Sequence, residues 1–100
     1  MRIVETLTFI FDKNNLIWQN DMEFNEAFIQ TTVKCLGELF TSRHYILKKE
    51  VYGAFGFKWG PEQINWFYAW GEDGDEIRLG YIESLDNMDG MIFQIMFVAN

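Results

Sequence analysis

The chain has 100 residues, 49% of them apolar and 18% aromatic, and a formal net charge of −7 at neutral pH. This composition predicts a single domain over residues 1–100 with a sizeable core, and it excludes a disordered chain. The single cysteine excludes an internal disulfide framework, and no signal peptide or apolar run of membrane-spanning length is readable. We therefore expect a cytoplasmic protein.

The N-terminal residues predict a hairpin. Residues 3–11 alternate between the two sides of an extended chain, which is typical of a β-strand. The polar run at 12–15 is typical of a turn, and residues 16–18 are expected to return as a short second strand.

A long amphipathic helix is predicted over residues 21–41. Asn20 and Glu23 have the spacing of a capping box at its start. Apolar residues recur at steps of three and four along one side, and we expect Cys35 to be buried there and inert. Gly37 costs about 1 kcal/mol relative to alanine inside a helix, so it is expected to mark the close approach of another element.

The second half of the chain predicts short helices followed by strands. Residues 47–55 suit a short helix that Gly56 closes in a left-handed conformation, and Gly60 with Pro61 suits the start of another helical turn. Residues 66–70 and 76–82 flank a Gly-rich acidic segment and are expected to pair as a hairpin.

The last strand completes the predicted fold. Residues 91–98 are apolar on both faces except for Gln94, which is typical of a central strand covered on both sides. The order of elements predicts an α+β fold: an antiparallel sheet of four to five strands, with one long and one or two short helices packed on one face.

One set of spaced residues begins at Glu50, Val51 and Tyr52 and continues through Gly56, Phe57 and Trp70 to an acidic hairpin. This set, over about half of the chain, resembles a module of small phage-encoded proteins of unknown function. Two positions depart from it: Ala69 stands where the module has glycine before tryptophan, and Leu47 stands where a polar helix cap is expected. The resemblance implies a phage or mobile-element origin and supplies no catalytic residue.

The residues that could carry chemistry predict no enzyme. His44 is the only histidine, and we expect it to be partly exposed rather than paired with Cys35 for catalysis. No phosphate-binding loop or nucleophile elbow is present. The carboxylates at 72–76 and 86–89 could offer oxygens to a hard cation, but their spacing does not match an EF-hand loop. We therefore predict no metal site and no cofactor.

The densest aromatic stretch contains Trp59, Trp66, Phe67, Tyr68 and Trp70. Such rings could stack on nucleic-acid bases if they faced outward, but no lysine or arginine lies between them to attract phosphates. We therefore expect these rings to belong to the core or to the apolar centre of a protein interface.

The negative charge is concentrated between residues 71 and 90, where seven acids and one base give −6 of the net −7. Such a negative pole can steer and hold a basic partner, and it disfavours direct binding to nucleic acids or anionic membranes. The predicted partner-binding residues are the anionic ones and two neighbouring rings, namely Glu72, Asp73, Asp75, Glu76, Asp86, Asp89, Trp70 and Tyr81.

The leading hypothesis is a non-enzymatic acidic binding protein. It would be a phage or mobile-element inhibitor, similar in action to anti-CRISPR proteins, that occludes the basic nucleic-acid-binding surface of a bacterial defence protein such as a nuclease. One alternative is a toxin immunity protein. Another is a phage structural or assembly protein that forms a homodimer or larger homo-oligomer through residues 91–98 or an exposed strand edge. The acids could also serve only to keep an apolar domain in solution.

Overall fold

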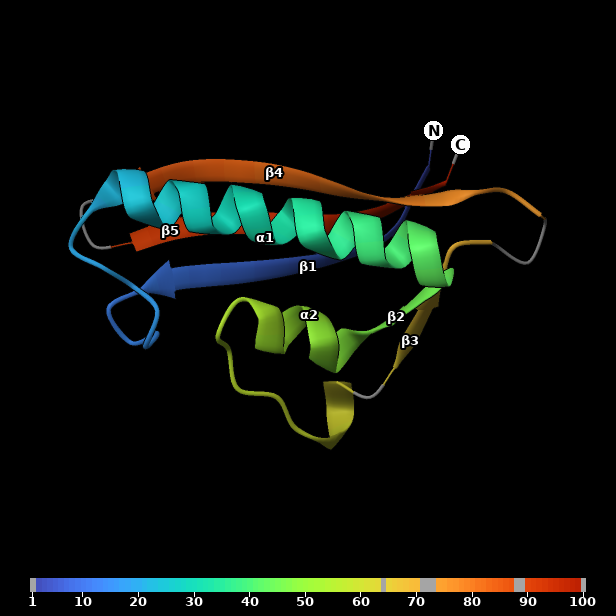
Figure 1. Cartoon of the computed structure of the whole chain (residues 1–100), viewed down its shortest axis with the longest axis horizontal. Helices are drawn as coiled ribbons and strands as arrows, with labels where there is room; N and C mark the ends of the chain where they lie inside the picture. The colour runs from blue at the N-terminus through green and yellow to red at the C-terminus, as the bar shows by residue number, and fades with distance from the viewer. Residues whose placement is uncertain (1, 64, 71–73, 88–89, 100) are drawn as a thin grey trace.

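The computed structural model describes residues 2–63, 65–70, 74–87 and 90–99 (Figure 1). The side chains of residues 63 and 83–87 lie outside this description. Within these residues five strands form two antiparallel sheets, and a long and a short α-helix pack on one face of the larger sheet. The predicted α+β class is therefore confirmed.

The larger sheet has the order β1-β5-β4, with β1 at Arg2–Asp12, β5 at Gly90–Ala99 and β4 at Ile77–Asn87. The predicted central position of residues 91–98 is confirmed, because β5 pairs with a strand on each side. Alternate residues of β5 from Met91 onward are buried, and those between them are half-buried. Only one face of β5 is packed, so the predicted cover on both sides is wrong within the part of the chain that is described.

The smaller sheet pairs β2, at Tyr45–Leu47, with β3, at Trp66–Tyr68. This pairing differs from the predicted hairpin between residues 66–70 and 76–82. Those two segments meet only at an isolated bridge between Trp70 and Glu76 and at the hydrogen bond from the Ile77 N–H to the Ala69 carbonyl, 2.7 Å long. β3 turns away from β4 because it forms its ladder with β2 instead.

The long helix α1 spans Met22–Arg43. Its cap is Asp21, one residue after the predicted Asn20, and the Asp21 carboxylate accepts a hydrogen bond from the Phe24 N–H at 3.2 Å. It ends at His44, whose backbone is left-handed at a φ of 67° and whose N–H donates to the Phe40 carbonyl. No helix in the described residues is both long and apolar enough to cross a membrane.

The short helix α2 spans Lys48–Ala54, and the 3-10 turn η1 spans Pro61–Gln63. Gly56 follows α2 with a φ of 81°, which confirms the predicted left-handed closure. A side chain at this position would also clash, because a Cβ would lie 2.8 Å from the Oδ1 of Asn15, whose amide is held by two hydrogen bonds. Glycine is therefore required here both by conformation and by space.

The predicted second strand at residues 16–18 is wrong, and Asn15 explains why. Its buried side chain donates to the Phe55 carbonyl at 2.8 Å and accepts from the Ile17 N–H at 2.8 Å. These bonds fold the segment into consecutive turns against the end of α2 and leave Leu16 99% exposed. A side-chain amide that forms a hydrogen bond with the backbone two residues further along the chain competes with strand pairing.

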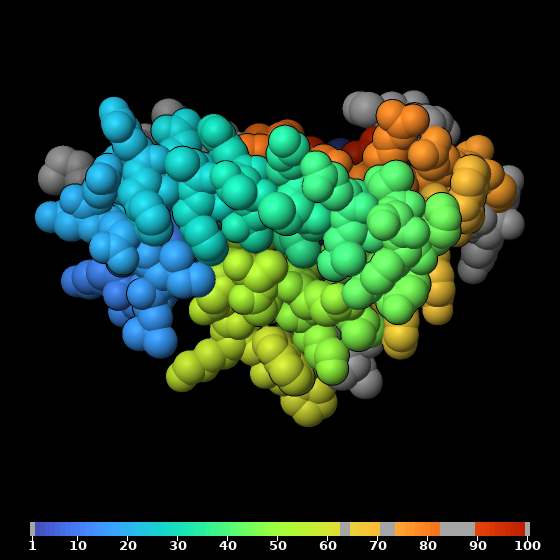
Figure 2. All heavy atoms as spheres, in the orientation of Figure 1, coloured from blue at the N-terminus to red at the C-terminus, as the bar shows by residue number. Residues whose placement is uncertain are grey.

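The core lies between the larger sheet and the two helices, which together cover the face seen in Figure 2. The buried residues of α1 form a narrow stripe that contains Ile29, Leu36 and Phe40. Cys35 is exposed, which corrects the expectation that it is buried. Successive residues of an α-helix are rotated by about 100° around its axis. Cys35 therefore points away from the buried stripe that contains its neighbour Leu36.

An ion pair holds the end of α1 against the start of α2. The Arg43 guanidinium donates to both carboxylate oxygens of Glu50, at 3.0 and 2.7 Å, and to the Tyr45 carbonyl at 3.3 Å. Glu50 also accepts from the Leu47 N–H at 3.0 Å. The hydrogen bond from Arg43 lowers the pKa of Glu50, and the bond to Glu50 raises the pKa of Arg43.

Replacing Asn15 by alanine should lower the free energy of unfolding by about 3 kcal/mol, because two backbone groups lose their partner in a buried place. The matched control is Asn14→Ala, since Asn14 is exposed, and we expect a change within about 0.5 kcal/mol. Urea denaturation measures both. Equal effects of the two substitutions would contradict the role assigned to Asn15.

Glu50→Gln should reduce the urea midpoint at pH 7, and the difference from the unchanged protein should shrink as the pH falls below about 4. The folded pKa of Glu50 is lowered, so its stabilisation is present above the unfolded pKa and is lost as the pH falls through the folded pKa. Glu26→Gln, on the exposed surface of α1, serves as the control. A difference that stays constant between pH 7 and pH 3 would show that the ion pair does not contribute in this way.

Candidate functional site

The β2–β3 pair presents one side to the core and the other to solvent. Phe67 of β3 stacks on Phe97 of β5, with ring centroids 4.0 Å apart and an interplanar angle of 14°. Because successive side chains of a strand point to opposite sides, Trp66 and Tyr68 face outward. Both are exposed.

Two further rings extend this outward side. Tyr45 pairs with Tyr68 across the ladder, and its ring lies 5.1 Å from the ring of Trp66. The rings of Trp66 and Tyr68 are nearly parallel at 6.4 Å. Trp70 follows two residues later and is 56% exposed. These rings are therefore not core residues, although Phe67 is packed against the core as expected.

Two acids adjoin the end of this row of rings. Glu76 forms the bridge with Trp70, and Asp75 precedes it. Both acids are half-buried, and the Glu76 carboxylate accepts from the Arg78 guanidinium at 3.3 Å. We use the name aromatic–acidic corner for Trp66, Tyr68, Trp70, Asp75 and Glu76.

The corner contains three of the eight residues predicted to bind a partner: Trp70, Asp75 and Glu76. Tyr81 is not among them, because it lies on the helix-covered side of β4 with its ring 6.4 Å from that of Phe93. Three of the other predicted acids, Glu72, Asp73 and Asp89, lie outside the described residues. Asp86 lies on β4, but its side chain is not described.

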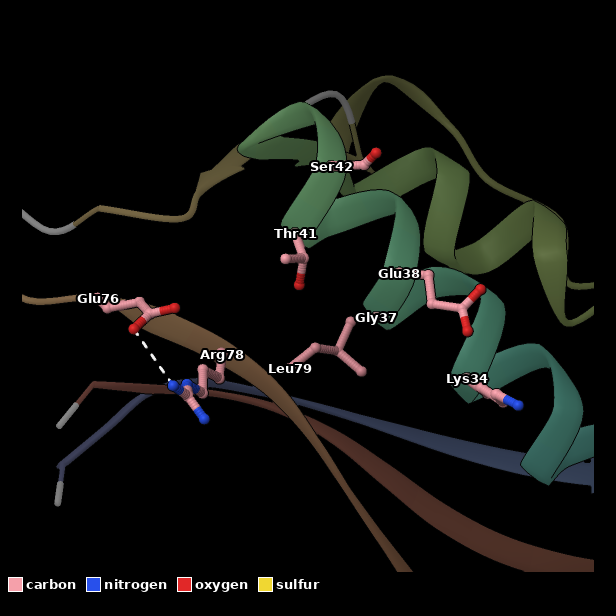
Figure 3. Close-up of a pocket in the computed structure, with 8 residues that line it drawn as sticks. All are labelled: Lys34, Gly37, Glu38, Thr41, Ser42, Glu76, Arg78 and Leu79. Carbon is pink, nitrogen blue, oxygen red and sulfur yellow. Dashed lines mark hydrogen bonds and ion pairs between the residues drawn. The ribbon is translucent and has the colours of Figure 1, made fainter.

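A groove of about 660 Å³ lies beside the corner, between α1 and β4 (Figure 3). Figure 3 shows Thr41 and Leu79 directed into the space between the two elements. The residues that line it are Lys34, Gly37, Glu38, Thr41, Ser42, Glu76, Arg78 and Leu79. Its two bases balance its two acids, so the groove does not select a ligand by the sign of its charge.

Gly37 lines this groove. Apart from its two chain neighbours and the nearby backbone of α1, no described atom lies within 4 Å of where a Cβ at Gly37 would stand. The expected close approach of another element at this glycine is therefore wrong for the described part of the chain.

His44 has a structural position at the edge of the corner. Its N–H closes α1, and its carbonyl accepts from the Ala69 N–H at 2.9 Å, which extends the contact between β2 and β3 toward Trp70. Among the described residues, no group of three or more histidine, cysteine, aspartate or glutamate side chains could hold a metal ion.

The outward position of Trp66 and Tyr68 was not predicted. A usable signal was present, because Trp66, Tyr68 and Trp70 alternate with Phe67 and Ala69. This period of two predicts one aromatic side and one side that packs on the core. The density of rings, taken without their period, left two interpretations open for these residues: the core and the apolar centre of a protein interface.

No family model, no curated protein and no solved structure matches the chain. The corner is therefore characterised by its own residues, which are three exposed rings and two acids, joined where the backbones of Trp70 and Glu76 form a β-bridge.

Proposed function

We propose that this protein is a non-enzymatic binding protein that holds a basic partner protein at the aromatic–acidic corner. The observation that carries the proposal is the exposed side chain of Trp70, whose backbone forms a β-bridge with that of Glu76, the residue that follows Asp75. A large ring that becomes buried supplies affinity, and carboxylates at its rim supply approach and selectivity.

The magnitudes assign different tasks to the rings and the acids. Burying the exposed half of an indole, roughly 100 Å², contributes about 2.5 kcal/mol at 25 cal/mol per Å². An exposed ion pair contributes only about 0.2–1 kcal/mol. Trp70 therefore dominates the affinity, while the acids chiefly raise the rate of association with a positively charged surface.

The particular role proposed is inhibition of a nucleic-acid-binding protein of a bacterial host, in the host cytoplasm. Two features of the sequence support it. The stretch 71–90 carries −6, which suits occlusion of a groove lined with lysine and arginine. The module around Glu50, Val51 and Tyr52 resembles phage-encoded proteins. A toxin immunity protein would use the same physics, and recovery of a toxin rather than a defence nuclease as the bound protein would favour that alternative.

The first test is capture of the partner from extracts of the natural host on the immobilised chain, followed by affinity measurement. Trp70→Ala should weaken binding of the captured protein about 50-fold, because the buried indole is lost. Trp59→Ala is the matched control, since Trp59 is an exposed tryptophan in the loop after α2, and should change affinity less than about twofold. A Trp70→Ala variant that binds as well as the unchanged protein would refute the corner as the site.

The second test concerns charge. Asp75→Lys with Glu76→Lys should slow association with the captured partner at least about tenfold at low salt and flatten the salt dependence of the rate. Glu26→Lys on α1 alters the net charge away from the corner and serves as the comparison for each single substitution. If Glu26→Lys slowed association as much as Asp75→Lys did, the effect would belong to net charge and not to this site.

A further inference from the structure

The smaller sheet has two strands, and its hydrogen bonds determine which backbone groups point away from it. The Lys48 N–H donates to the Asn65 carbonyl at 2.8 Å, and the Ala69 N–H donates to the His44 carbonyl at 2.9 Å. In an antiparallel ladder, pairs of residues that exchange hydrogen bonds alternate with pairs whose N–H and C=O groups point outward. The two bonded pairs at the ends fix this alternation for every residue of the ladder between them.

The outward groups of β2 belong to Tyr45 and Leu47, and side chains of the same chain bind them. The Tyr45 carbonyl accepts from the Arg43 guanidinium at 3.3 Å, and the Leu47 N–H donates to the Glu50 carboxylate at 3.0 Å. The ion pair between Arg43 and Glu50 therefore closes the outer edge of β2. A further strand cannot pair at this edge without breaking these bonds.

The outward groups of β3 belong to Trp66 and Tyr68. No backbone hydrogen bond joins their outward N–H and C=O groups to another described part of the chain. Both side chains are exposed, so solvent reaches this edge. Unpaired backbone groups in a row along an exposed strand are a template for another strand.

A cavity of about 660 Å³ adjoins the outer edge of β3. The described residues that line it come from both sides of β3 and from β1, and none of them comes from β2: Val4, Glu5, Asn65, Trp66, Phe67 and Tyr68. Glu5 pairs with Phe97, the residue on which Phe67 stacks. The Glu5 side chain is therefore on the side of the larger sheet where β3 packs.

The wall opposite β3 determines the charge of what fits this cavity. Glu5 is exposed and forms no ion pair with another described residue. Its carboxylate attracts a lysine or arginine side chain and repels a second copy of this chain, whose net charge is −7. The register of β1 with β5 shifts between Ile3 and Glu5, and such an irregularity disrupts regular pairing. An extended occupant therefore pairs with β3 rather than with β1.

We propose that an extended segment of the basic partner fills this cavity and adds to β3 as the third strand of the smaller sheet. Its backbone pairs with the outward groups of Trp66 and Tyr68, and one of its lysine or arginine side chains reaches Glu5. The inference rests on the proposed function, because it states how the aromatic–acidic corner holds its partner. Main-chain bonds accept any extended segment, while Glu5 and the exposed rings select its side chains.

A short peptide of alternating lysine and valine, with blocked ends, tests strand addition to the isotopically labelled full chain. Added to about 10 mM, it should shift the amide resonances of Trp66 and Tyr68 more than that of Phe67, whose N–H already faces β2. The matched control is the same peptide with N-methylated amides. It cannot donate backbone hydrogen bonds and should bind at least about tenfold more weakly.

Equal binding of the two peptides, or no shift at Trp66 and Tyr68, overturns the proposal. Shifts at these two amides that follow protein concentration without any peptide would assign the edge to a second copy of the chain and would also overturn it.

Glu5→Gln should weaken binding of the unmethylated peptide about two- to fivefold, since one exposed ion pair is lost. Glu26→Gln on α1 is the control and should bind the peptide as the unchanged protein does. Equal binding by the two variants would overturn the proposal. Failure of these peptide measurements refutes strand addition alone, whereas a Trp70→Ala variant that still holds the captured protein refutes the proposed function.

Discussion

The stack of Phe67 on Phe97, at 4.0 Å between ring centroids, is the contact on which the aromatic–acidic corner depends. It joins the smaller sheet to the central strand of the larger one. Because side chains alternate along a strand, one inward ring on β3 requires its neighbours Trp66 and Tyr68 to face outward. The exposed rings at the corner are thus a consequence of how the core is packed, and the two cannot change independently.

The rest of the core supports this arrangement from both ends of α1. At one end, Asn25 is fully buried and its amide bonds both the N–H and the carbonyl of Gln19, which fixes the entry to the helix. At the other end, Arg43 clamps Glu50 and lies over the Tyr45 ring at 4.3 Å, which orients β2. Between these points, Phe55 of the segment after α2 packs on Phe93. The helix layer therefore holds the smaller sheet in place.

The fold class, the long helix, the closure at Gly56 and the central place of β5 could be predicted because each follows from local periodicity or from one residue's conformational preference. The failures share a different cause. The turns after β1 depend on the bond of Asn15 to Phe55, forty residues away, and the pairing of β3 depends on a choice between β2 and β4. Long-range choices of this kind leave little trace in a single sequence.

In the candidate site, the proximity of Trp70, Asp75 and Glu76 could be predicted because they are close in sequence. Tyr81 was grouped with them on the same ground, but it lies on the helix-covered side of β4. Residues 91–98 were predicted to be covered on both sides, but Ile92, Met96 and Val98, on the side of β5 away from the helices, are only half-buried. Sequence patterns of apolar residues predict that a surface will be covered, but they do not say whether the cover belongs to the same chain.

Amide hydrogen exchange of the chain, with and without the partner captured from its host, tests the central claim most directly. We expect slower exchange in β3 and at residues 69–70 and 75–77 when the partner is bound, since a partner that buries Trp70 shields the backbone around the bridge. Slower exchange confined to other parts of the chain, with this segment unchanged, would contradict it.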